Sequence, residues 1–106
     1  MDLLEASAPD LEKYKIAILP FGSIENHGPH LPLGTDSIIA EAIAKEIAKK
    51  INGIVFPTFL FAPALEPNLS LPLDLCYKVF YSILEKICRL GFKRIIIISA
   101  HGPGFH

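Results

Sequence analysis

Four side chains of this 106-residue chain have the types and spacing to bind a metal ion. Glu25, His27 and Asp36 lie in one stretch dense in Gly, Pro and His, and His101 stands near the C-terminal end before a glycine. Mixed imidazole and carboxylate ligation suits zinc, manganese or iron(II), and a carboxylate can bridge two ions. The pattern predicts a site for a divalent metal: zinc first, manganese or iron as alternatives, and one ion or two.

Each of these residues also has an ordinary structural explanation. Asp36 precedes a helical pattern and could be the N-cap of a helix that begins at Ser37. Glu25 alone would be a solvated charge, and His27 or His30 alone would be a hydrogen-bonded loop histidine. From the residues alone, the metal site and these alternatives stay equally open.

Three short apolar runs predict buried strands, at 15–21, at 54–57 with a resumption at 59–61, and at 94–99. Helical patterns separate them, and strands that alternate with helices of this length call for a parallel sheet with right-handed crossovers. The sequence therefore predicts an α/β fold: a three-layer βαβαβ unit with a mainly parallel sheet, in one domain over residues 1–106.

The two predicted helices each carry an apolar stripe. The first, ended by Asn52-Gly53, has the stripe Ile38, Ile39, Ala42, Ile43, Ile47 and Ala48. The second starts near Pro72, ends at Gly91, and has the stripe Leu75, Cys76, Val79, Phe80, Ile83, Leu84, Ile87 and Leu90. In such a fold the carboxyl ends of the strands share one edge. The first and last strands would therefore bring His101 to the other three candidate ligands.

The candidate ligands lie in motifs that resemble a known family. The stretch 25–36 (ENHGPHLPLGTD), preceded by LPFGS at 19–23, closely resembles the signature of the creatininase (creatinine amidohydrolase) family, with Asn26 where glutamine is common. The stretch 91–95, GFKRI, and the strand after it, which ends in Ala-His-Gly, look like the second landmark of that family. The resemblance covers nearly the whole chain in order, and the first motif is the more specific.

The resemblance implies a two-metal centre whose ligands are Glu25, His27, Asp36 and His101, with Asp36 as the bridge. His30 would stand beside the site, holding a ligand or lining the pocket. Family members hydrolyse cyclic amides or formamides, through a metal-bound hydroxide that attacks the polarised carbonyl. The first hypothesis is thus a metal-dependent amidohydrolase that cleaves a C–N bond of a small-molecule substrate.

The alternative is a truncated, inactive creatininase-like remnant that acts as a structural or assembly module. Family members are longer, and their second half supplies further active-site residues. Pro103 stands where some relatives have another ligand, and 62–71 lacks the Tyr-Gly-x-Ser-x-Glu-His stretch of the family. The chain therefore corresponds to an N-terminal half of the fold.

The composition limits the classes of partner. Lys and Arg number 10 against 11 Asp and Glu, without a basic stripe, so a nucleic-acid partner is not expected. No apolar signal region opens the chain, and the longest apolar run, 95–98, is too short to cross a bilayer. Cys76 and Cys88 are predicted to be buried, reduced thiols, which suits the cytoplasm.

A sheet this small would leave an edge and an apolar face uncovered. The apolar share of 51% is high for so short a chain. We therefore expect a homo-oligomer, or a second chain that supplies the missing half.

Overall fold

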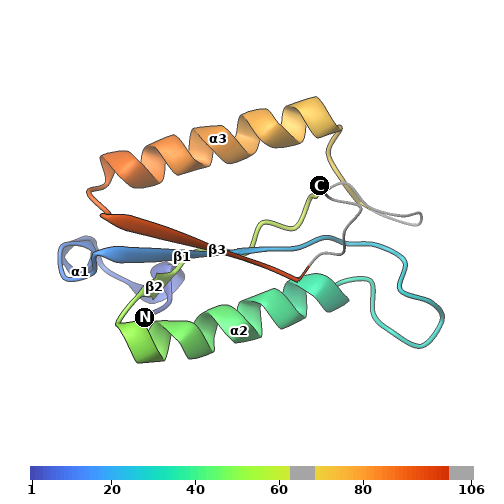
Figure 1. Cartoon of the computed structure of the whole chain (residues 1–106), viewed down its shortest axis with the longest axis horizontal. Coiled ribbons are helices and arrows are strands. Elements are labelled where there is room, and N and C mark those ends of the chain that lie inside the picture. Colours follow the sequence, from blue (N-terminus) through green and yellow to red (C-terminus); the bar gives the residue numbers. More distant parts are fainter. Residues whose placement is uncertain (63–68, 101–106) are drawn as a thin grey trace.

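The structure, a computed structural model, describes residues 1–62 and 69–100. A three-stranded sheet lies between two helices, with α2 (Thr35–Ile51) on one face and α3 (Leu73–Arg89) on the other (Figure 1). The strands are β1 (Ile16–Phe21), β2 (Ile54–Val55) and β3 (Arg94–Ser99). Their order is β2-β1-β3, and both pairings are parallel. The predicted α/β fold is confirmed.

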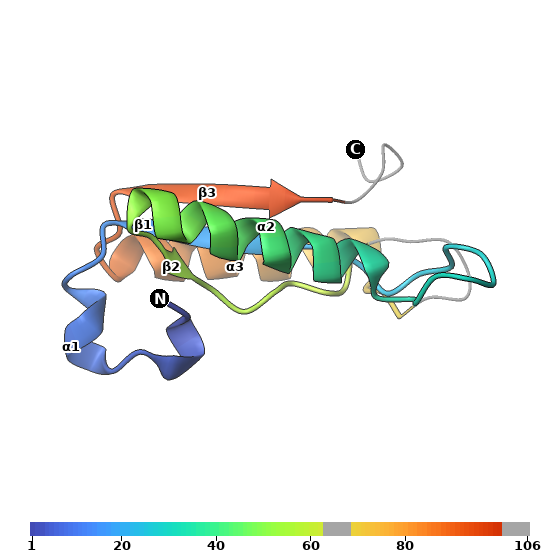
Figure 2. The same cartoon turned by 90° about the horizontal axis from the view of Figure 1, so that it is seen from below.

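Two short elements precede the sheet, a 3-10 helix at Leu3–Glu5 and α1 at Ala8–Leu11. They lie at the end of the molecule where β1 begins (Figure 2). The backbone N–H of Val55 donates to the carbonyl oxygen of Met1 at 2.8 Å, which attaches the N-terminus beside β2. Neither element is long enough to give the periodic pattern on which sequence prediction depends.

β1 is the centre of the core because helices cover both faces of the sheet. Ala17 and Leu19 belong to an apolar cluster on the α3 side, whereas Ile18 packs with Ala44 and Ala48 of α2. A strand buried on both faces has no polar alternation, which is why β1 appears in the sequence as a continuous apolar run.

β2 is shorter than the predicted strand 54–57. Its pairing stops after Val55 and resumes only as an isolated bridge between Phe21 and Phe59, the first residue of the predicted resumption at 59–61. Pro57 lies between the two paired stretches and has no N–H with which to continue the ladder.

The predicted stripe of the first helix is partly wrong. The residues of α2 that face the sheet include Ala40, Ala44 and Ala48, which are at most 3% exposed, whereas Ile38 is 59% exposed and both Ile39 and Ile43 are 44% exposed. These three alanines, four residues apart, form a ridge of small side chains on which the helix approaches the sheet closely. The prediction followed residue size, and the isoleucines are therefore misplaced.

α3 follows its prediction more closely. Cys76 and Ile87 are buried, and partly buried neighbours on the same stripe pack against the core. Leu75 and Leu90 at the two ends are exposed. Among the described residues, no helix has the length and apolar content needed to cross a membrane.

The prediction of two buried thiols is right for one of them. Cys76 is buried, and its burial raises the pKa of the thiol. Cys88 is exposed, because it lies on α3 outside the stripe that packs on the sheet.

The end of β1 presses against the first turn of α2. A Cβ atom placed on Gly22 would lie 2.4 Å from Ser37 Oγ and 2.6 Å from Ser37 Cα. Since one of those atoms belongs to the backbone, a rotamer change cannot relieve the contact. Gly22 is therefore the residue that lets the strand and the helix meet.

We predict that Gly22→Ala destabilises the fold by about 1–3 kcal/mol, the usual cost of overpacking. Gly34→Ala is the matched control, because its nearest atom would be Ile38 Cδ1 at 4.0 Å. Gly34 is the N-cap of α2, so this change should cost less than about 1 kcal/mol. Urea unfolding of both variants measures the difference, and equal losses would contradict the role assigned to Gly22.

Candidate metal centre

The loop between β1 and α2 closes on itself. The backbone N–H of Glu25 donates to the carbonyl oxygen of Leu33 at 2.9 Å, which joins the start of the loop to its end. Within it, Asn26 Oδ1 accepts from the N–H of Gly28, whose φ of 86° is readily available to glycine. The loop therefore returns the chain to the first turn of α2 beside its own beginning.

This closure brings three of the four predicted ligands together. One ligand atom from each of Glu25, His27 and Asp36 can be chosen so that all lie within 4.8 Å of one another. His27 Nε2 is 3.4 Å from Asp36 Oδ2 and 3.8 Å from Glu25 Oε1. Both carboxylate residues are buried, at 6% and 7% exposure.

Asp36 is not the N-cap of the helix. α2 begins at Thr35 with Gly34 as its N-cap, so Asp36 is the second helical residue. Its carboxylate faces Ser23 and His27. The N-cap explanation of Asp36 is therefore wrong, and its position in the first turn still favours a negative charge through the helix dipole.

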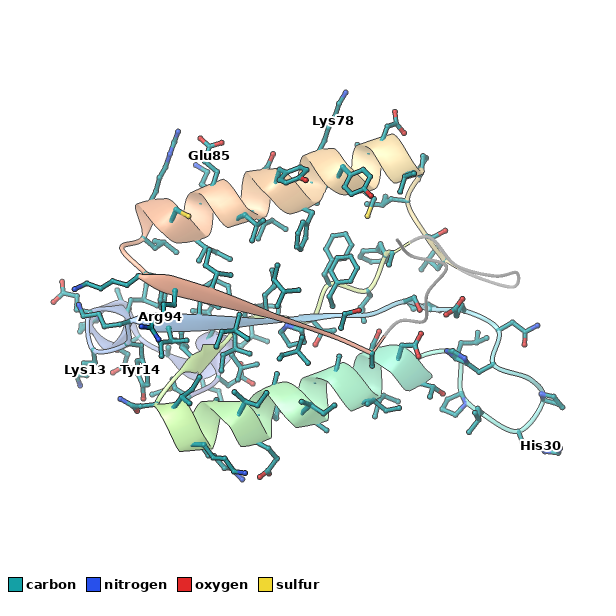
Figure 3. All side chains as sticks on the ribbon, viewed as in Figure 1. Lys13, Tyr14, His30, Lys78, Glu85 and Arg94 are labelled. Carbon is teal, nitrogen blue, oxygen red and sulfur yellow. The ribbon has the colours of Figure 1, made fainter. Side chains whose placement is uncertain are left out.

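The other two predicted residues are not part of this group. His30 is exposed and lies at the outer end of the loop (Figure 3). His101 lies outside the described residues. β3, which leads toward it, ends with Ser99 opposite Phe21, at the same edge of the sheet from which the loop departs.

Sequence reasoning assigned no role to Ser23. This residue is fully buried, and its Oγ lies 3.2 Å from Asp36 Oδ2 and 3.3 Å from Glu25 Oε1. Its carbonyl oxygen accepts a hydrogen bond of 2.9 Å from Ser37 Oγ. The available signal was a small hydroxyl residue two positions before Glu25, directly after the strand end.

The residues present fit a divalent metal ion. Among the described residues, His27 Nε2 is buried and has no hydrogen-bond partner, a costly state for a polar atom. It faces two carboxylate oxygens instead. Two ligands of one tetrahedral zinc, each about 2.0–2.1 Å from the ion, lie about 3.4 Å apart. The separation of His27 Nε2 and Asp36 Oδ2 has this length, 3.4 Å.

Comparison with known proteins identifies the family. The sequence model of the creatininase family, described as creatinine amidohydrolase, matches residues 4–105. The chain belongs to the creatininase family. The resemblance carried by the two sequence motifs is thereby confirmed.

Two relatives illustrate the range of the family. A 2-amino-5-formylamino-6-ribosylaminopyrimidin-4(3H)-one 5'-monophosphate deformylase of Methanobrevibacter smithii is 33% identical over 95 residues, which are 84% of this chain and 41% of the relative. A 3-dehydro-scyllo-inosose hydrolase of Thermotoga maritima is 26% identical over 101 residues, 90% of this chain and 32% of the relative. The chain thus spans less than half the length of either relative.

Solved creatininase structures share the fold. A crystal structure of creatininase has a TM-score of 0.87 at 19% identity and covers 94% of this chain, which in turn covers 44% of it. Structures described as "Creatininase Mn" and as a Zn-Zn type mutant have TM-scores of 0.82, at 19% and 20% identity, and this chain covers 45% and 43% of them. These likenesses extend over nearly all of this chain, consistent with an N-terminal portion of the family fold.

Without a metal, the two carboxylates should strain the fold. One oxygen of each carboxylate lies within 4.8 Å of the other, and two unit charges at about that distance repel by about 3 kcal/mol at an effective dielectric near 20. The favourable interaction of Asp36 with the helix dipole offsets only about 0.3–1 kcal/mol of this repulsion. We therefore predict that Asp36→Asn raises the unfolding midpoint of the metal-free protein, by several degrees if about 1 kcal/mol is recovered. Calorimetry in a chelator measures this, and a lower midpoint would contradict the repulsion.

Proposed function

We propose that this chain carries the metal-binding part of a metal-dependent amidohydrolase. The proposed reaction is hydrolysis of an amide-type C–N bond in a small molecule, either a cyclic amide or a formamide. Membership of the creatininase family and the similarity to a deformylase support this choice.

The observation that carries the proposal is the state of His27. Its Nε2 is buried, has no hydrogen-bond partner among the described residues, and faces the oxygens of Glu25 and Asp36. A histidine that only supported the loop would be expected to hydrogen-bond through that nitrogen. An imidazolium paired with two carboxylates is the competing arrangement, and metal titration separates the two.

The residues would share the work as follows. Glu25, His27 and Asp36 would hold one divalent ion, with His101 as a further ligand and Asp36 as the bridge if a second ion binds. When bound, such an ion supplies a Lewis acid and lowers the pKa of water to give a nucleophile at neutral pH. Zinc is the first candidate, and manganese or iron the alternatives. The Mn and Zn-Zn forms of creatininase support zinc and manganese.

The position of the site also fits catalysis. In sheets of this kind, ligands bind beyond the carboxyl ends of the strands, and the three residues follow β1 at that edge. The imidazole of His27 is 23% exposed, whereas Glu25 and Asp36 are less so. The exposed part of the His27 ring is thus not its Nε2 atom, which is buried.

The protein should bind zinc or manganese, and binding should depend on His27. Isothermal titration of the chelator-treated chain measures this, with plasma mass spectrometry of gently purified protein as a second readout. We expect His27→Ala to weaken binding at least tenfold, since one of the proposed ligands is lost.

His30→Ala is the matched control, because it removes an imidazole from the same loop at an exposed position outside the three-residue group. It should bind metal as the unmodified chain does. If His27→Ala and His30→Ala had equal effects, or if the unmodified chain bound no metal, the proposed centre would be wrong.

The metal-loaded chain should hydrolyse a formylamino-pyrimidine or a cyclic amide, and His27→Ala should reduce the rate to that of the buffer. Colorimetric or chromatographic detection of formate or of the ring-opened product measures the rate. A chain that binds metal but turns over none of these substrates would favour the alternative, a creatininase-like assembly module.

We also propose that the chain forms a homo-oligomer. Exposed Tyr77, Tyr81 and Ile97, over α3 and β3, leave apolar surface for a further copy to cover.

A further inference from the structure

We propose that Ser23 is a positioning residue of the metal centre. Its hydroxyl group fixes the carboxylates of Glu25 and Asp36 in the arrangement that a divalent ion requires. This inference rests on the metal site proposed above and adds a residue that is not itself a ligand. Nothing in the proposed chemistry requires a hydroxyl group at this position, so its role has to come from its contacts.

The hydroxyl group of Ser23 lies between the two acids. Ser23 Oγ is 3.2 Å from Asp36 Oδ2 and 3.3 Å from Glu25 Oε1. Both oxygens are the ones that also face His27 Nε2, at 3.4 and 3.8 Å respectively. The hydroxyl and the imidazole therefore contact the same two carboxylate oxygens.

The Ser23 hydroxyl group faces two carboxylate oxygens but can donate to only one of them at a time. A serine hydroxyl has one hydrogen to donate, whereas an ionised carboxylate only accepts. Ser23 can therefore donate to Asp36 or to Glu25 at one moment, and the second oxygen faces a lone pair. A cation bound by both carboxylates would lower the electrostatic repulsion among these oxygens, although it adds no proton to the hydroxyl group. The contacts of Ser23 thus suit a metal-loaded centre better than a metal-free one.

The surroundings of Ser23 hold its hydroxyl group in place. Ser23 has no solvent exposure, and its carbonyl oxygen accepts a hydrogen bond of 2.9 Å from Ser37 Oγ. The preceding residue, Gly22, lies against the backbone of Ser37. The end of β1 and the first turn of α2 therefore hold Ser23 from both sides, and outer partners held in this way orient metal ligands in advance.

If Ser23 had a purely structural role, its replacement would change the folding stability and not the contacts of the metal ligands. The nearby hydroxyl group of Ser37 has such a role, since it donates its hydrogen bond to the backbone carbonyl oxygen of Ser23 and not to a carboxylate. Both serines are buried. Ser37→Ala is therefore the matched control for Ser23→Ala: the two changes remove the same atom at neighbouring buried places, and only one of these atoms contacts the ligands.

The experiment is titration of Zn²⁺ into the chelator-treated full chain by calorimetry, for the unmodified protein, Ser23→Ala and Ser37→Ala. Thermal unfolding of each metal-free protein is recorded in parallel, and the visible spectrum of the Co²⁺ form reports the ligand geometry. We expect Ser23→Ala to weaken Zn²⁺ binding about tenfold or more, as changes to outer partners of metal ligands commonly do. It should also alter the Co²⁺ bands, and the lost hydrogen bond to a buried carboxylate should lower the metal-free unfolding midpoint.

For Ser37→Ala we expect a lower unfolding midpoint and a smaller loss of Zn²⁺ affinity than for Ser23→Ala, because the Ser37 hydroxyl group bonds to the backbone of Ser23 and not to a ligand. Equal Zn²⁺ affinity of Ser23→Ala and the unmodified chain would overturn the proposal for Ser23 alone. So would equal weakening by the two serine variants, or a Ser23→Ala chain that does not fold. Failure of the unmodified chain to bind Zn²⁺ would overturn the metal centre and, with it, the role of Ser23.

Discussion

The contact between the end of β1 and the first turn of α2 is the constraint on which the rest of the site depends. Gly22 lies against Ser37 so closely that no side chain fits between them. The hydroxyl group of Ser37 then bonds to the backbone of Ser23, and the loop from Glu25 to Leu33 closes outside this junction. Two acids that are eleven residues apart in sequence thus become neighbours because of a strand-to-helix contact beneath them.

The fold could be predicted from the sequence because each strand is either buried on both faces or bounded by residues that end regular structure. β3 was predicted with its observed limits, Arg94–Ser99, since Gly91 separates it from α3. The orientation of α2 was not predictable in the same way. A stripe of isoleucines and a ridge of alanines both have helical spacing, and which of them faces the sheet depends on the distance between helix and sheet, a tertiary quantity.

The same division applies to the candidate site. Glu25, His27 and Asp36 could be named from residue type and motif, and the described part of the structure brings them together. Only the structure could exclude the N-cap role of Asp36. The helix α2 begins at Thr35, just two residues before the start at Ser37 that the sequence pattern predicts. The contacts of Ser23 could not be predicted either, since Asp36 is thirteen residues away in sequence and nothing in the sequence indicates where the hydroxyl group of Ser23 points.

The alanine ridge of α2 has a consequence beyond packing. Ala40, Ala44 and Ala48 are nearly inaccessible to solvent and carry the smallest side chains that still favour a helix. The distance from the helix axis to the sheet is thus fixed by three methyl groups, and Asp36 is attached to that same helix. A larger residue at any of these positions would displace the acid from its partners without touching it. The ridge therefore fixes the position of the site from a distance, while the exposed isoleucines lie on the outer surface of the helix.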